Sequence, residues 1–121
     1  MKRRYRLRRK ADFQSALKGK RIYSGRGLVV LASPSDRDES RVGVTVSRQL
    51  KGAVERNRAR RRLRELARLA ILPADSGAAR LGIRYDVVLI ARPAALTLRF
   101  ADLKAEAEQA AQRLSGSRSE S

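Results

Sequence analysis

The sequence has no cysteine and no histidine, and aromatic residues make up only 4% of it. Without cysteine there can be neither disulfide bonds nor thiolate chemistry, and without histidine as well a structural zinc site has no plausible set of ligands. The same absences remove the usual nucleophile and general base of an enzyme, and the serines have no partners for a catalytic triad. The composition therefore argues against metal, redox or catalytic chemistry carried out by this chain alone.

Long apolar runs are also missing. Hydrophobic residues make up 42% of the chain, but they are spread along it and never form the run of about 18 that a transmembrane helix needs. The first ten residues carry seven Lys or Arg with no apolar segment after them, which is not the pattern of a secretory signal. We therefore expect one cytoplasmic domain over residues 1–121, with a basic flexible arm at 1–8 and a frayed tail at 115–121.

Acidic residues are scarce beside basic ones. Twelve Asp and Glu stand against 29 Lys and Arg, which gives a formal charge of +17. The excess is uneven, since residues 1–72 hold 22 of the basic residues and 6 of the acidic ones. Genomic base composition can explain a preference for Arg over Lys, but it cannot explain the net charge. A compact domain so charged repels itself unless a polyanion binds it, so the charge predicts a nucleic-acid partner.

Hydrophobic patterns predict a single-domain α+β sandwich with the element order αβββαβα. The expected helices cover about 9–18, 53–70 and 99–114, and the expected strands cover 21–24, 28–32, 41–47 and 85–91. Valines alternate with Arg41, Gly43 and Thr45 along 41–47, which predicts one buried and one exposed face. The nearly continuous apolar run at 85–91 predicts a strand that is buried on both faces.

The helix expected at 53–70 has two different faces. At 100° per residue, one narrow arc holds Ala59, Leu63, Leu66 and Ala70, and the adjacent arc holds Asn57, Arg60, Arg61, Arg64 and Arg68. Like charges at i and i+4 destabilise an isolated helix by a few tenths of a kcal/mol per pair, and bound phosphates would relieve that repulsion. A basic face that only confers solubility is the alternative, but soluble surfaces usually mix both charges.

The segment 51–65, with Arg56-Asn57-Arg58 at its centre, resembles the Arg-Asn-Arg signature of the bacterial ribonuclease P protein subunit. Other stretches resemble that family in the same order, namely Arg6-Leu7, Asp12-Phe13, 41–47 and 86–92. Together they cover roughly 7–114. A collinear set of this kind is far more specific than a lone Arg-Asn-Arg.

The resemblance implies an α/β sandwich in which the signature helix lies in a left-handed crossover between parallel strands. It also implies that the helix and its loop bind a catalytic RNA, and that a cleft between the first helix and the sheet binds the 5′ leader of precursor tRNA. The residues expected to bind RNA are Arg48, Lys51, Arg56, Asn57, Arg58, Arg60, Arg61, Arg64 and Arg68. Those expected to line the leader cleft are Phe13, Leu17 and Leu31.

Three positions depart from the pattern of the family. Leu17 and Leu31 stand where many members have an aromatic residue, so we expect stacking on a leader base to be less secure than phosphate binding. Gln49 replaces a frequent Lys, which removes one charge. Phe13 could also be an ordinary core residue.

As a function, the resemblance implies a subunit that assists Mg²⁺-dependent cleavage by RNA, with Mg²⁺ held mainly by the RNA and the substrate. The implied partners are the catalytic RNA and precursor tRNA, with no membrane, no DNA and no second protein copy required. We interpret the acidic cluster Asp36, Asp38 and Glu39 as a solvated turn rather than a metal site. A ribosomal or RNA-chaperone protein remains an alternative, and a nuclease in its own right is a third.

Overall fold

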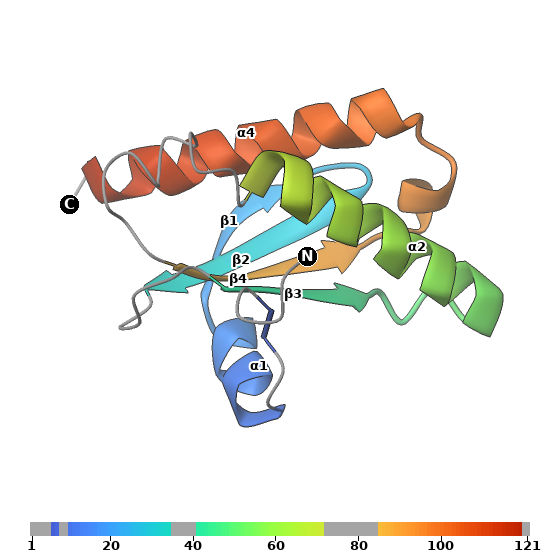
Figure 1. Cartoon of the computed structure of the whole chain (residues 1–121), viewed down its shortest axis with the longest axis horizontal. Helices are drawn as coiled ribbons and strands as arrows, with labels where there is room; N and C mark the ends of the chain where they lie inside the picture. Colours follow the sequence, from blue (N-terminus) through green and yellow to red (C-terminus); the bar gives the residue numbers. More distant parts are fainter. Residues whose placement is uncertain (1–5, 8–9, 35–40, 72–84, 120–121) are drawn as a thin grey trace.

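A computed structural model of the chain is shown in Figure 1 and describes residues 6–7, 10–34, 41–71 and 85–119. Its elements are α1 (Lys10–Leu17), β1 (Lys20–Ser24), β2 (Leu28–Pro34), β3 (Arg41–Val46), α2 (Ala53–Leu66), β4 (Tyr85–Ala91) and α4 (Phe100–Ser119). A π-helical turn, η2 (Ala67–Ile71), extends α2, and a 3₁₀ turn, η3 (Pro93–Leu96), follows β4. The α+β class and the predicted order αβββαβα are confirmed.

The four strands form one mixed sheet in the order β1-β2-β4-β3. Strand β2 pairs antiparallel with both β1 and β4, whereas β3 and β4 are parallel neighbours. Because α2 lies between β3 and β4 in the chain, these elements form the βαβ crossover that the family resemblance implied. The left hand of that crossover stays a prediction.

The main core lies between one face of the sheet and the pair α2 and α4, while α1 covers the opposite face (Figure 1). Its largest fully buried side chains include Leu28 on β2, Leu63 on α2, Leu89 on β4 and Leu103 on α4. The strand β4 is buried on both faces as predicted, since Val87 and Leu89 face this core and Val88 faces α1. No helix of the described residues is long and apolar enough to cross a membrane.

The last helix is longer than predicted. Its apolar stripe, Leu103, Ala107, Ala110 and Leu114, is buried as expected. However, α4 continues to Ser119, past the predicted helix end at 114, while the frayed tail expected at 115–121 stays a prediction. A helix that is already nucleated gains one hydrogen bond for each residue that it adds, which lets it continue past the end of its apolar stripe.

The second face of β3 is less exposed than its alternating pattern predicts. Gly43 is buried, and a Cβ atom at that position would lie 2.5 Å from Cε2 of Phe13. The prediction of an exposed face was therefore wrong here, because α1 crosses the sheet above this strand. A side chain larger than hydrogen at residue 43 would displace the aromatic ring.

The arm expected to be flexible is attached to the sheet near its end. Arg6 forms an isolated parallel bridge with Val42, and the backbone N–H of Leu7 donates to the carbonyl of Val42 at 3.0 Å. The side chain of Leu7 is buried between α1 and the sheet. The remainder of the arm, the acidic cluster at 36–39 and the Gly and Ala loop at 74–82 lie outside the described residues.

Candidate nucleic-acid interface

Helix α2 separates apolar from basic residues as its sequence predicts. Ala59, Leu63 and Leu66 are 0% exposed and pack in the main core. The opposite face carries most of the predicted RNA-binding residues, and the loop before the helix carries the rest. Those that are exposed are Arg48, Lys51, Asn57, Arg58, Arg61, Arg64 and Arg68.

Five of these cations are free to bind a ligand. The side chains of Arg48, Lys51, Arg58, Arg61 and Arg64 make no hydrogen bond or ion pair with any other residue of the described ranges. Guanidinium groups pair with phosphate oxygens through two parallel hydrogen bonds, so an Arg-rich surface of this kind suits a phosphate backbone. The helix and loop together therefore present unneutralised positive charge toward solvent.

Three predicted RNA-binding residues, Asn57, Arg60 and Arg68, have partners on the helix itself. Arg60 donates to Oδ1 of Asn57 at 3.0 Å, and Arg68 forms an ion pair with Glu65. The hydrogen bond from Arg68 lowers the pKa of the Glu65 carboxyl, and the same bond raises the pKa of Arg68. A phosphate that binds Arg68 would therefore compete with a carboxylate that stays ionised at neutral pH.

Arg56 has a structural role that sequence reasoning did not assign. Its Nη1 donates to the carbonyls of Ser47 at 3.2 Å and Leu50 at 2.7 Å. These contacts hold the loop between β3 and α2, which carries Arg48 and Lys51. The one sequence signal was angular, because Arg56 lies only 60° from Ala59 on the helical projection, at the edge of the buried arc.

We predict that Arg56→Ala lowers the free energy of unfolding by about 1.5 kcal/mol, the low end for a charged hydrogen bond, because this side chain is half-buried. It should also weaken RNA binding, because the loop with Arg48 and Lys51 loses its anchor. Urea melts and RNA titrations measure the two effects. Arg58→Ala is the matched control and should weaken binding without changing the melt. A wild-type melt for Arg56→Ala would contradict the anchoring role.

Arg62 also has a structural role that sequence reasoning did not assign, although it too lies only 60° from Ala59 on the helical projection. Its guanidinium donates to the carbonyls of Ala95 and, at 2.9 Å, Leu98. These bonds tie α2 to the turn η3 and to the segment before α4. This side chain is half-buried and bonded to the protein, so it is not part of the exposed basic surface.

Helix α1 lies across the middle of the opposite sheet face. The strand registers place Leu31, Val88 and Gly43 in one row across the sheet. Ala16 and Phe13 of α1 pack on this row, where Val88 is 0% exposed. The rows on either side differ in chemistry. One row contains Ser33, Asp86 and Arg41, and the other contains Val29, Ile90 and Thr45.

The residues predicted to line the leader cleft lie around this middle row. Phe13, Leu31 and Ile90 are partly buried and pack together with Ala16 and Val88. Leu17 follows Phe13 by four residues, on the same flank of α1, and is 40% exposed. The structure thus brings Phe13 and Leu31 into one apolar cluster and leaves Leu17 largely at its surface. Phe13 is neither fully buried nor fully exposed, so its packing is compatible with both roles considered above.

The sequence matches the family model described as Ribonuclease P over residues 1–115. This chain belongs to the ribonuclease P protein family. The "Ribonuclease P protein component" of Acidothermus cellulolyticus is 44% identical over 115 residues, covering 92% of this chain and 88% of that protein. The Roseiflexus sp. protein of the same name is 40% identical, covering 93% and 88%. The family resemblance that the Arg-Asn-Arg signature indicated is confirmed.

Solved structures give the same result. The ribonuclease P protein from Thermotoga maritima superposes with a TM-score of 0.69 at 26% identity, covering 89% of this chain and 96% of that chain. The Staphylococcus aureus ribonuclease P protein gives a TM-score of 0.67 at 28% identity, covering 89% and 93%. The alternative of an unrelated ribosomal or RNA-chaperone protein is therefore not favoured.

Proposed function

We propose that this chain is the protein subunit of a bacterial ribonuclease P holoenzyme, which removes the 5′ leader from precursor tRNA. The observation that carries the proposal is the row of free cations on α2 and its loop, within a chain that belongs to this family. A polyanionic partner would neutralise that charge, and structured RNA offers phosphates on a rigid surface. The catalytic RNA is the partner that we assign to this face.

We further propose that the RNA, and not the protein, carries the cleavage chemistry. Among the described residues, groups of three or more His, Cys, Asp or Glu side chains that could hold a metal ion do not occur. The described residues therefore fit a resident metal poorly, and we assign Mg²⁺ to the RNA and the substrate. The contribution of the protein is to bind both RNAs and to orient the leader.

The proposal also includes a cellular location and a number of protein copies. Bacterial precursor tRNA is made in the cytoplasm, so we place the protein there. A single copy presents the whole α2 face, and neither DNA nor a second protein copy is needed for the role. Precursor tRNA would meet the α1 side of the sheet while the catalytic RNA occupies the α2 side.

A binding comparison separates this function from that of a general RNA-binding protein. The chain is titrated against its catalytic RNA and, at the same salt concentration, against a ribosomal RNA fragment of equal length. The proposal expects saturable one-to-one binding to the catalytic RNA that is at least tenfold tighter, a difference of about 1.4 kcal/mol. Equal affinity for the two RNAs would contradict it.

We assign the leader to the apolar flank of α1, where Phe13 packs with Leu31 and Ile90. Phe13→Ala should then weaken binding of leader-bearing precursor about fivefold to tenfold and leave leaderless tRNA unaffected. An aromatic ring stacked on a base contributes about 1 to 3 kcal/mol, and the low end applies because Leu17 and Leu31 offer no further stacking.

Holoenzyme made with the wild type or with Phe13→Ala is titrated with precursors carrying no leader, a short leader and a longer leader. Both proteins must first be shown to melt alike. Equal weakening for all three RNAs, or a large drop in melting temperature, would return Phe13 to the core and leave the leader site unassigned.

A further inference from the structure

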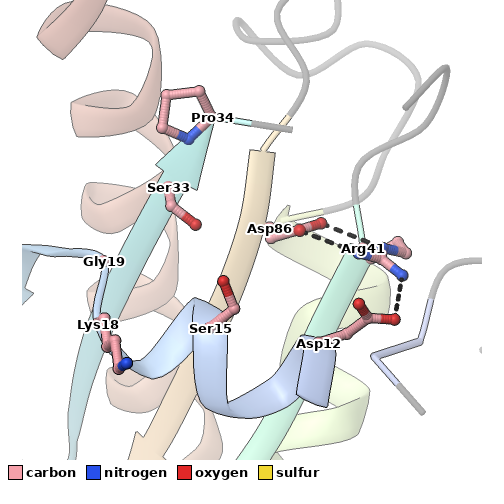
Figure 2. A pocket seen from close by; sticks show the side chains of 8 residues that line it. All are labelled: Asp12, Ser15, Lys18, Gly19, Ser33, Pro34, Arg41 and Asp86. Carbon is pink, nitrogen blue, oxygen red and sulfur yellow. Dashed lines mark hydrogen bonds and ion pairs between the residues drawn. The ribbon is translucent and has the colours of Figure 1, made fainter. Parts of the chain in front are cut away.

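Three charged side chains meet on the flank of α1 that faces away from the apolar cluster. They come from three elements, as Figure 2 shows: Asp12 from α1, Arg41 from the start of β3 and Asp86 from the start of β4. Arg41 donates through Nε to Asp86 Oδ1 at 3.1 Å and through Nη2 to Asp86 Oδ2 at 3.0 Å. Its Nη1 donates to Asp12 Oδ2 at 3.2 Å. We refer to these three residues as the clamp.

The clamp is partly shielded from solvent. The side chains of Arg41, Asp12 and Asp86 are 12%, 28% and 17% exposed. They line an open pocket of about 550 Å³ behind α1. The hydrogen bond to Asp86 raises the pKa of Arg41, and the hydrogen bond to Asp12 contributes further. The guanidinium therefore stays charged, with a fixed orientation between the two carboxylates.

The two halves of the clamp have different structural consequences. Arg41 and Asp86 are register partners on adjacent parallel strands, so their bidentate pair lies within the sheet. Asp12 belongs to α1, so its bond to Arg41 connects the helix to the sheet. Loss of Asp86 would remove a contact inside the sheet, whereas loss of Asp12 would release one edge of the helix.

The position of α1 controls the position of Phe13. Phe13 is the next residue after Asp12, and its ring lies over Gly43, two residues after Arg41 on β3. A Cβ at Gly43 would come within 2.5 Å of the ring, so the ring rests directly on the backbone of the sheet. A small shift of the helix would therefore move the ring by a similar distance.

We propose that Asp12 and Arg41 are positioning residues for the 5′ leader, which fasten α1 to the sheet so that Phe13 is held over Gly43 at the height that a leader nucleotide requires. This inference rests on the proposed leader cleft on the other flank of α1. Neither residue needs to touch RNA, because the pocket that they line lies on the flank of α1 opposite the proposed leader cleft. The clamp thus sets the width of the cleft from its far side.

The test compares Asp12→Ala with Asp86→Ala in the reconstituted holoenzyme. Both variants remove one carboxylate bonded to Arg41 and raise the net charge by the same amount, so nonspecific attraction for RNA changes equally. We expect Asp12→Ala to weaken binding of leader-bearing precursor by about threefold to fivefold relative to leaderless tRNA, the size expected when one partly exposed ion pair is lost. Asp86→Ala should lower the melting temperature at least as much as Asp12→Ala does. It should leave the ratio of affinities for leader-bearing and leaderless RNA unchanged.

A double-mutant cycle with Phe13 identifies the route of the effect. If Asp12 acts through Phe13, then Asp12→Ala adds nothing to the loss caused by Phe13→Ala in the leader-bearing titration. Gly43→Ala, which displaces the same ring, should reproduce the leader-specific loss. If Asp12→Ala fails to fold, Asp12→Asn, which keeps the size of the side chain and removes its charge, replaces it as the test variant.

Two results would overturn the inference. The first leaves the proposed leader cleft intact, and the second overturns the cleft as well. If Phe13→Ala weakens leader binding but Asp12→Ala and Asp86→Ala give equal ratios, the clamp has no positioning role and the leader cleft still stands. If Phe13→Ala has no leader-specific effect, the proposed cleft fails and the inference fails with it.

Discussion

Raising the salt concentration from 50 to 200 mM should weaken binding of this protein to its catalytic RNA by about a thousandfold. The expectation follows from the exposed cations of α2 and its preceding loop, each of which displaces counterions when it pairs with a phosphate. Six or more such contacts give about this loss, with the duplex-DNA relation as a guide. The formal charge of +17 provides enough basic residues for that number.

The measurement is a series of titrations at four or more salt concentrations, with the slope of log affinity against log salt as the readout. Removing one contacting cation, as in Arg61→Ala, should reduce the slope by nearly one unit. A nearly flat response would contradict the electrostatic account, whatever the affinity at low salt.

Leu63→Ala should lower the free energy of unfolding by about 2 to 5 kcal/mol, because it leaves a cavity in a fully buried part of the core. Arg61→Ala and Arg64→Ala should instead leave the free energy of unfolding unchanged and weaken RNA binding. Their side chains are exposed and make no hydrogen bond or ion pair with the described residues, so the fold should be intact while assembly with the RNA is impaired. Denaturant melts and RNA titrations of the three variants measure both quantities.

The melts of Arg64→Ala and Leu63→Ala give the most direct comparison, because the two residues are adjacent in the chain. The two positions are one residue apart but lie on different faces of the helix, because Leu63 is buried and Arg64 is exposed. A melt of Arg64→Ala as low as that of Leu63→Ala would show that the two faces of α2 are assigned incorrectly.

Local periodicity accounts for most of what could be predicted from the sequence. The apolar arc of α2, the continuous apolar run of β4 and the stripe of α4 each depend on neighbours within one element, and all three are buried as expected. The Arg-Asn-Arg signature and its collinear partners indicated the family and the parallel βαβ crossover. These features are readable because helix and strand repeats fix which residues share a face.

Contacts between distant segments could not be predicted in the same way. Nothing in the pattern of β3 indicates that Phe13 covers Gly43, because that contact joins residues 30 positions apart and depends on where α1 crosses the sheet. Arg56 and Arg62 have the same composition signal as the free cations around them. Their structural role depends on hydrogen bonds to backbone carbonyls of other segments. Every residue has a backbone carbonyl, so the sequence does not show which ones accept these bonds.

The clamp illustrates the same limit. Asp12 and Arg41 both lie in stretches that resemble the family, but the resemblance gave neither residue a role. Only the strand register places Arg41 beside Asp86, and only the packing of α1 brings Asp12 to the same guanidinium. The exact end of α4 is a further example, because the persistence of a packed helix outweighed the weak helix propensity of a Ser-rich end.

The central claim, that the protein assists an RNA that performs the cleavage, is tested most directly by reconstitution. Precursor tRNA is incubated at low Mg²⁺ with the protein alone, with the catalytic RNA alone and with both. We predict 5′ cleavage only when both are present. Cleavage by the protein alone would contradict the assignment of catalysis to RNA, and equal activity of the catalytic RNA with and without the protein would contradict the role of this chain as its subunit.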